Sequence, residues 1–504
     1  MKFINRSTYS RKRDLIRVIN IIMIMVLLAA CSPIEPVPVY ITPFPQTAVP
    51  DQEAAVEPTP LATRPVYDPG TLVSYTAQTG DSLPALAAHF NTSVAEIFDA
   101  NPQLQPDTTT LTPGESLQIP IYYKALWGNS FQIMPDALFI NGPAQIGFDT
   151  RAFVDAHPGW LKNYSVLAGY EMRRGGYLVD FVARNYSISP RVLLALIEYQ
   201  AQGLSSETIP EDLETYPLGY EDQFNSGLYK QLNWAANVLN NGYYGWRVGD
   251  FDEITRLDGS IEHPDPWQNA ATVALQNYFA GLLPFEDYQA AIYSEGFYKT
   301  YTDLFGDPWQ NYTDHIAGNL RQPELALPFN LGKTWSFTGG PHAAWGSGEP
   351  LAALDFAPPA VVGGCTPSNE YVVAVADGLI VRSESALVLL DLDGDGDERT
   401  GWVILYLHLG KKEQIQTNML VKKWDPIGHP SCEGGSATGT HVHIARKYNG
   451  EWMPAAGVPA FNLEGWVAGK GSAEYLGTLK KHGRTVEACT CSDPDSQIPA
   501  GKYE

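Results

Sequence analysis

Thr440-His441-Val442-His443-Ile444 is the stretch of this 504-residue sequence that decides most about the C-terminal fold. Residues two apart in a β-strand project from the same face, so His441 and His443 are expected to point together. A glycine-rich run, Gly434-Gly435-Ser436-Ala437-Thr438-Gly439, comes directly before the pair and favours close approach of a ligand. Two imidazoles on one face suit a metal site, although histidines also occur in sheets for structural reasons.

Short β-branched runs separated by glycines surround this stretch and predict an antiparallel sheet over residues 328–475. Tyr406-Leu407-His408-Leu409 places His408 at the end of one strand. Ala353-Leu354-Asp355-Phe356-Ala357 places Asp355 inside another, where a carboxylate is costly unless it is paired or bound to metal. One aspartate and two histidines would hold zinc in a tetrahedral site with one position open for water. Two further histidines can then move protons and stabilise an oxyanion.

This combination of segments resembles the M23 metallopeptidases of the lysostaphin and LytM type, which cleave peptidoglycan peptides. The resemblance covers about the last third of the chain and includes the His-x-His strand and the Tyr-x-His-Leu segment. It implies that Asp355 and His443 are zinc ligands and that His408 and His441 are the catalytic histidines.

The sequence departs from the family pattern at one ligand. The family usually has its first histidine four residues before the aspartate, where this chain has Leu351, which cannot bind zinc. His342 lies further upstream, after Gly339-Gly340-Pro341, and an inserted loop over residues 343–350 can carry it into the same corner. We therefore expect His342 to be the third ligand. The alternative is a degenerate, non-catalytic relative that binds peptidoglycan or activates another hydrolase.

Residues 72–123 show the pattern of a small β-α-α-β unit. A strand-like run from Leu72 to Thr76 leads to Gly80-Asp81-Ser82-Leu83, where Asp81 or Ser82 can cap a helix. A second helix is expected after Thr92-Ser93, and a turn and a closing strand follow it. The pattern resembles a LysM module, which implies binding to N-acetylglucosamine-containing glycans; the alternative is a spacer without a ligand. The matching residues are Tyr75, Gly80 to Leu83, Ala87, Asn101-Pro102, Pro113-Gly114 and Leu117 to Pro120.

Residues 124–327 are rich in aromatic residues and have helical periodicity, for example over 177–186 and 190–200. The stretch from Ile188 to Ile197 resembles the first helix of lysozyme-like lytic transglycosylases, which need a carboxylic acid to protonate the glycosidic oxygen. The position of that acid is Gln200 here, and an amide cannot donate the proton. We expect a lysozyme-like helical region without this activity, or a plain helical spacer. A glycan-cleaving enzyme that uses Glu198 or Glu207 is a further alternative.

The N-terminus has the pattern of an export signal. Basic residues up to Arg17 precede an apolar run, Val18 to Ala30, that is shorter than the roughly 20 residues of a membrane-spanning helix. The run ends in Leu28-Ala29-Ala30-Cys31, which resembles the lipobox of bacterial lipoproteins and implies that Cys31 is lipidated. The alternative is an ordinary transmembrane anchor. Either one places the rest of the chain outside the cytoplasm, in the cell envelope.

The net charge argues against one class of partner, and the cysteines permit disulfide bonds. The formal net charge is -23, which disfavours a surface that neutralises nucleic-acid phosphates. Four cysteines follow Cys31, and disulfides are permitted in an exported chain. We favour a bond between Cys365 and Cys432, with free buried thiols as the alternative; Cys489 and Cys491 are the other two.

Asp391-Leu392-Asp393-Gly394-Asp395-Gly396-Asp397 partly matches a calcium-binding EF-hand loop. Acids occupy positions 1, 3 and 5, and glycine occupies position 6, but position 12 is Trp402 instead of a bidentate glutamate. We therefore expect an acidic hairpin between two strands, with weak calcium binding at Asp391, Asp393 and Asp395 as the alternative.

The expected fold is a multidomain α+β chain: a small β-α-α-β LysM module, a mostly α lysozyme-like middle domain and an antiparallel all-β M23-type peptidase domain. We expect zinc as the cofactor and peptidoglycan as the partner, its glycan strands bound by LysM and its stem peptides by the C-terminal domain. The expected boundaries are 1–31 for the signal peptide, 32–71 for a proline-rich linker, 72–123 for LysM, 124–327 for the helical region, 328–475 for the peptidase and 476–504 for a tail.

Overall fold

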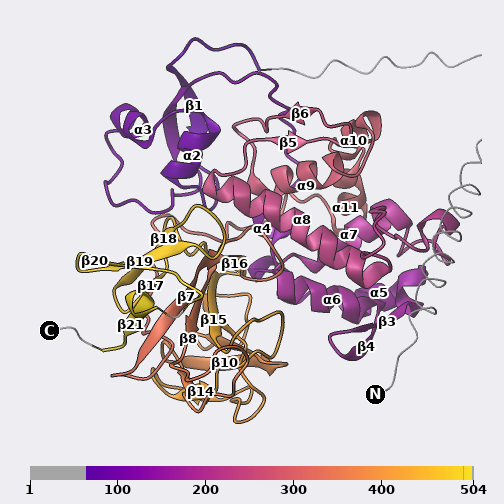
Figure 1. Ribbon diagram of the computed structural model, residues 1–504. Coiled ribbons are helices and arrows are strands. Elements are labelled where there is room, and N and C mark those ends of the chain that lie inside the picture. Colours follow the sequence, from indigo (N-terminus) through magenta and orange to yellow (C-terminus); the bar gives the residue numbers. More distant parts are fainter. Residues whose placement is uncertain (1–63, 492, 502–504) are drawn as a thin grey trace, which may run out of the picture. The chain divides into compact units, whose positions relative to one another are not determined.

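A computed structural model of the chain describes residues 64–491 and 493–501 (Figure 1). The expected signal peptide, Cys31 and most of the linker lie outside the described residues. Among the described residues, none of the helices has the length and apolar character needed to cross a bilayer.

The LysM-like part has the expected order β-α-α-β. Strands β1 (Thr71–Thr76) and β2 (Ser116–Ile121) pair antiparallel, and helices α2 (Leu83–His89) and α3 (Val94–Ala100) lie between them in sequence. The side chain of Ser82 accepts a hydrogen bond from the Ala85 amide at the start of α2. Ser93 and Glu96 form a capping box at the start of α3, so both helices begin where side-chain oxygens satisfy free amides.

The middle of the chain is mainly helical. The helices predicted over 177–186 and 190–200 are confirmed as α6 (Gly175–Tyr186) and α7 (Pro190–Ala201). The longest helix of this part is α8 (Leu228–Val248), and it packs against α9 (Ala270–Ala280). The shorter helices are α4 Asp136–Phe139, α5 Thr150–Ala156, α10 Phe285–Ala291 and α11 Phe297–Phe305, and the hairpins are β3 Ser165–Ala168 with β4 Glu171–Arg174 and β5 Ile254–Thr255 with β6 Ile261–Glu262.

The C-terminal part is built on antiparallel strands. Within the described residues, a nine-stranded sheet has the order β13-β10-β11-β12-β15-β8-β7-β21, with β16 paired to β15. Its strands are β7 Thr334–His342, β8 Ala353–Ala357, β10 Gly378–Glu384, β11 Leu387–Asp391, β12 Trp402–Leu407, β13 Leu420–Val421, β15 Val442–Tyr448, β16 Glu451–Trp452 and β21 Gln497–Pro499. Smaller sheets join β9 Val372–Val373 with β14 Pro426–Gly428, and β17 Asn462–Leu463, β18 Trp466–Lys470, β19 Gly477–Lys481 and β20 Arg484–Glu487 in that order.

The central strands of the large sheet are buried on both faces. Along β12, Ile404 and Tyr406 pack into the core of the β-rich part. Val403, Leu405 and Leu407 alternate with them and pack into the same core as the helices. Because successive side chains of a strand point to opposite faces, the continuous apolar run in β12 follows from covering on both sides. The helical region thus covers one face of the large sheet and shares a core with it.

The segment 476–504, expected to be a tail, carries regular structure. Strands β19 and β20 extend the four-stranded sheet, and β21 pairs with β7 at the edge of the large sheet. The β-rich part therefore continues past the expected boundary at residue 475. The expectation failed because these strands are short and their partners lie far away in the sequence.

The structure confirms the disulfide expected between Cys365 and Cys432, and Cys489 is bonded to Cys491. It also confirms the acidic hairpin, since β11 ends at Asp391 and β12 begins at Trp402.

Candidate metal centre

Three neighbouring strands place three metal-ligating side chains together. His342 is the last residue of β7, Asp355 lies in β8, and His443 lies near the start of β15. In the antiparallel register, Asp355 lies opposite His443 on one side and opposite Gly339 on the other. The register between β7 and β8 is irregular at two points after Phe337, and this brings His342 toward the aspartate. All three side chains are buried.

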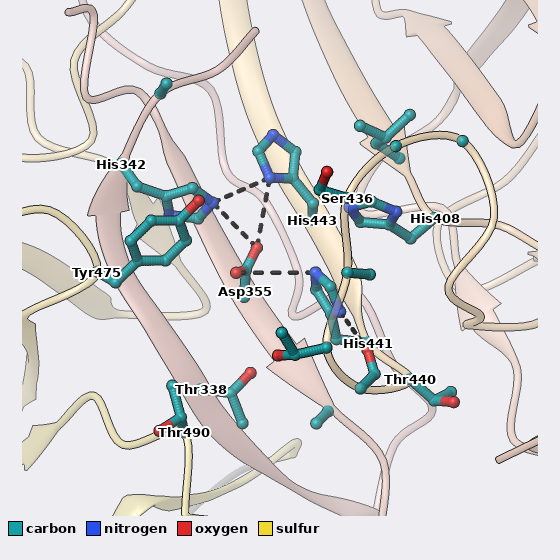
Figure 2. Close-up of a pocket in the computed structure, with 18 of the residues that line it drawn as sticks. Thr338, His342, Asp355, His408, Ser436, Thr440, His441, His443, Tyr475 and Thr490 are labelled. Atoms are coloured by element: carbon teal, nitrogen blue, oxygen red, sulfur yellow. Dashed lines mark hydrogen bonds and ion pairs between the residues drawn. The ribbon is translucent and has the colours of Figure 1, made fainter. Parts of the chain in front are cut away.

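The donor atoms of the three residues converge on one point (Figure 2). His342 Nε2 lies 3.0 Å from His443 Nδ1 and 3.2 Å from Asp355 Oδ1. His443 Nδ1 lies 3.4 Å from the same carboxylate oxygen. This buried oxygen has no well-directed hydrogen bond within the described residues. Two ring nitrogens and a carboxylate oxygen that face one another could hold a metal ion between them.

The opposite nitrogen of each imidazole faces a backbone carbonyl. His342 Nδ1 lies 2.7 Å from the oxygen of Gly340, and His443 Nε2 lies 3.2 Å from the oxygen of Ala344. Because carbonyls only accept, each of these nitrogens carries the proton and donates it. The lone pairs of His342 Nε2 and His443 Nδ1 are thus left for a metal, as in metal sites whose histidines are oriented by a second hydrogen bond.

The charges in the cluster favour a bound cation. Burial by itself would raise the pKa of the Asp355 carboxyl, but His342 and His443 hold this pKa well below its usual range. Burial lowers the pKa of the His443 imidazole. Burial acts in the same direction on His342, but the charge of Asp355 and the hydrogen bonds to Asp355 and to the Gly340 carbonyl together outweigh it, and the pKa of His342 is raised. The ionised carboxylate therefore draws positive charge into the centre of the cluster.

His408 and His441, the two expected catalytic histidines, lie beside this cluster with their ring centroids 4.5 Å apart (Figure 2). His408 follows β12 and has a left-handed backbone with φ of 66°. Its Nδ1 donates to the Glu433 carbonyl at 2.8 Å, which leaves Nε2 free to accept a proton. The Nδ1 of His441 donates to the Gly439 carbonyl at 2.7 Å, and its Nε2 lies 3.8 Å from Asp355 Oδ2. Burial and then the neighbouring His441 lower the pKa of His408 to about 4.

A cavity of about 940 Å³ opens onto all five of these residues. Glycines and other small residues form much of its wall, including Gly363, Gly364 and the run from Gly434 to Gly439. The disulfide between Cys365 and Cys432 ties the two glycine-rich segments together beside the cavity. Such a wall leaves room for an extended peptide close to the backbone.

Tyr475 is a cavity residue that the sequence analysis missed. Its ring stacks on the imidazole of His342, with centroids 4.2 Å apart and planes 20° apart. The residue has a left-handed backbone with φ of 65° and is about half exposed. No local pattern marks a stacking partner that is more than 100 residues away from His342, so the sequence holds no signal for it.

The structure also bears on the residues that the sequence left as alternatives. Leu351 does not line the described cavity, whereas His342 does. The Glu198 carboxylate accepts hydrogen bonds from the amides of Leu204 and Ser205, just after its helix ends. It therefore satisfies free backbone amides, which is a structural task.

The calcium alternative gains no support. The Asp391 carboxylate accepts hydrogen bonds from the backbone amides of Asp393, Gly394 and Gly396, so its oxygens are used within the hairpin. Burial and a hydrogen bond with Asp393 raise the pKa of Asp391 to about 6. Asp393 and Asp395 are exposed.

Comparison with known proteins adds independent information. The family model "LasA, N-terminal domain" matches residues 132–319, and the model "LysM domain" matches residues 75–120. The helical region therefore resembles the LasA N-terminal domain, and the lysozyme-like interpretation of it remains a prediction. The chain is 27% identical over 342 residues to Protease LasA of Pseudomonas aeruginosa, an alignment that covers 64% of this chain and 75% of that protein.

The chain is also 31% identical over 137 residues to the beta-lytic metalloendopeptidase of Lysobacter enzymogenes, which covers 25% of this chain and 71% of that protein. Among solved structures, the deep-sea M23 metalloprotease pseudoalterin matches with 24% identity and a TM-score of 0.28, covering 33% of this chain and 96% of that one. The similarity to the beta-lytic enzyme and the LysM match identify the chain as a LysM-containing metalloendopeptidase of the M23 family.

Proposed function

We propose that the chain is a zinc-dependent endopeptidase that hydrolyses the peptide cross-links of bacterial peptidoglycan. The observation that carries the proposal is the geometry of His342 Nε2, Asp355 Oδ1 and His443 Nδ1, which lie 3.0 to 3.4 Å from one another. Zinc bonds of about 2.0–2.1 Å in a tetrahedron separate the ligand atoms by roughly 3.3 Å. The three atoms would then hold the ion, with the fourth position toward the cavity.

Zinc bound at this site supplies Lewis acidity, which polarises a peptide carbonyl and lowers the pKa of water. The protein would supply the proton transfer. His408, neutral near pH 7 and protonated at Nδ1, would take a proton from the attacking water at Nε2. The resulting imidazolium can stabilise the oxyanion and then give its proton to the departing amine. His441, on the same side of the cavity, would orient the water or the carbonyl oxygen.

The substrate class follows from two parts of the chain. The match at residues 75–120 describes a LysM domain, and we propose that it binds the glycan strands of the cell wall. The glycines and other small residues that line the catalytic cavity leave room for an extended peptide close to the backbone. We further propose that lipidation of Cys31 tethers the enzyme to the outer side of the membrane; this rests on the sequence before the described residues.

The test uses the full chain and purified peptidoglycan. We expect one bound zinc per chain by elemental analysis and release of new amino termini without new reducing-end sugars. His342→Ala and His443→Ala should each abolish both the bound zinc and the activity, because each removes one ligand. His482→Ala, in the exposed turn between β19 and β20, is the matched control and should retain both.

Three results would contradict the proposal. Wild-type protein that binds no zinc and releases no amino termini would exclude a zinc peptidase. Reducing-end sugars would indicate a glycosidase. Full activity in the His342→Ala variant would exclude this residue as a ligand.

A further inference from the structure

The loop between β7 and β8, residues 343–352, connects the helical region to the metal centre. Its first part, from Ala343 to Ser347, lines the catalytic cavity. The carbonyl of Ala344 is the hydrogen-bond acceptor for His443 Nε2 at 3.2 Å. The position of this loop therefore sets the orientation of the His443 imidazole and the direction of its Nδ1 lone pair.

The loop packs mainly into the helical region. Ala344 and Ala352 are almost fully buried and belong to the hydrophobic core formed by the helices. Trp345 is partly buried against the same core. The buried apolar residues of the loop therefore belong to the core that the helices share with one face of the sheet. The far end of the loop also meets the β-rich part, where the Leu351 carbonyl accepts a hydrogen bond from the Ala455 amide.

Two asparagines of α8 bind the backbone of this loop. Asn237 accepts a hydrogen bond from the Ser347 amide at 2.8 Å and donates one to the Ser347 hydroxyl at 3.1 Å. Asn241 accepts a hydrogen bond from the Glu349 amide at 2.6 Å. The two asparagines are four residues apart and so lie on the same face of the helix.

Two glycines of the loop fit against these asparagines. Gly346 and Gly348 have φ of 80° and 77°, a conformation that favours glycine. A Cβ on Gly346 would lie 2.4 Å from Asn237 Oδ1, and a Cβ on Gly348 would lie 2.3 Å from Asn241 Oδ1. Both the backbone conformation and the close approach thus require glycine, and the glycines match the asparagines one to one.

A short hydrogen-bonded path links Asn241 to the metal centre. The Glu349 amide donates a hydrogen bond to Asn241. Pro350 follows Glu349, and its carbonyl accepts a hydrogen bond from the Ala344 amide at 3.2 Å. The Ala344 carbonyl in turn accepts a hydrogen bond from His443 Nε2. Loss of the contact at Asn241 would therefore weaken the hold on the part of the loop that orients His443.

We propose that Asn237 and Asn241 are positioning residues of the peptidase: they hold the 343–352 loop so that Ala344 orients His443 for metal binding. The helical region then sets the metal affinity of a site to which it contributes no ligand. This inference rests on the proposed role of His443 as a metal ligand. It assigns to the helical region a task in the active enzyme.

The test measures metal binding by the full chain, prepared without metal, in competition with a chelator of known zinc affinity. Replacing an outer hydrogen-bonding partner of a metal ligand typically weakens metal binding by about 10–100-fold. We expect a loss of this size in the Asn237→Ala/Asn241→Ala double variant. The visible absorption spectrum of the cobalt-substituted protein should change in the same variant, because the spectrum reports the ligand geometry.

Two further variants separate positioning from folding. Asn241→Asp retains the oxygen that accepts the Glu349 amide and should keep near wild-type affinity, whereas Asn241→Ala should not. The matched control is Asn233→Ala, one turn before Asn237 on α8. The Asn233 side chain has no hydrogen bond to the loop among the described residues. The single Asn241→Ala variant loses one hydrogen bond, about 1 kcal/mol, and should stay folded.

The inference is overturned if the double variant and Asn241→Ala, both folded by circular dichroism, bind zinc within about twofold of wild type and give an unchanged cobalt spectrum. Equal losses in Asn241→Ala and Asn241→Asp would also overturn it, because the acceptor oxygen would then be irrelevant. Wild-type protein that binds no metal would instead reject the proposed function and the inference with it.

Discussion

The substitution Gly339→Ala tests whether the backbone of β7 must pass directly beside the metal centre. Gly339 lies opposite Asp355 in the register of β7 and β8. A Cβ at this position would lie 2.6 Å from Asp355 Oδ2 and 3.0 Å from both its Cβ and its Cγ. These separations are shorter than ordinary contacts, so the carboxylate or the strand must move.

The expected cost has two parts. Extra volume in a packed core typically destabilises a protein by about 1–3 kcal/mol. A displaced carboxylate should also weaken metal binding by roughly 10–100-fold, which corresponds to about 1.4–2.7 kcal/mol of binding free energy. The loss in metal affinity should exceed anything a general loss of stability explains, because the added methyl group lies against a ligand.

The assay is zinc competition with a chelator together with denaturant unfolding of the metal-free protein. Gly363→Ala is the matched control, because it lines the same cavity and a Cβ there has no neighbour within 4 Å among the described residues. We expect the control to bind zinc as the wild type does. Wild-type zinc affinity in Gly339→Ala would refute the reasoning, because Asp355 would then not depend on the space that glycine leaves.

Three further predictions concern other parts of the chain. Burial alone would raise the pKa of Glu451, but the charge of Arg247 and the hydrogen bonds from His315 and Tyr243 together outweigh it, and the pKa falls to about 2. The unfolded carboxyl binds its proton first, near pH 4.5, so the group should stabilise the fold above that pH by on the order of 3 kcal/mol. This contribution should be lost as the pH falls from 4.5 toward 2. Denaturant unfolding at pH 5 and pH 3 should show a smaller loss in Glu451→Gln than in wild type, and equal losses would contradict the assignment. Residues 328–504 expressed alone should aggregate or bind a hydrophobic dye. Six large side chains that pack on the helices would be exposed in this fragment, at a cost on the order of 10 kcal/mol. A soluble fragment that unfolds cooperatively would show that the helices are dispensable. Leu351→His should not restore zinc binding to His342→Ala in the competition assay, because position 351 does not line the described cavity; restored binding would show that the loop can rearrange.

The elements that were predicted well are those in which short spacing decides the geometry. Ser82 and Ser93 start helices because their side chains satisfy amides three residues away. The hairpin after Asp391 also agrees with the structure, and so does the pairing of Cys365 with Cys432, although 67 residues separate these cysteines. Alternation along a strand similarly indicated that His441 and His443 share a face.

By itself, the sequence determined the order of the modules, the strands that carry Asp355 and His443, the strand that ends just before His408, and the departure from the family pattern at Leu351. Only the tertiary structure decided that His342 lies within 3.2 Å of both partners, because that depends on the irregular register of β7 against β8. The stacked Tyr475, the strands after residue 475 and the helical cover of the sheet were likewise decided by packing between distant segments. The physical reason is that a sequence pattern reports which side of an element is apolar, whereas the partner of that side is selected by long-range packing of the whole chain.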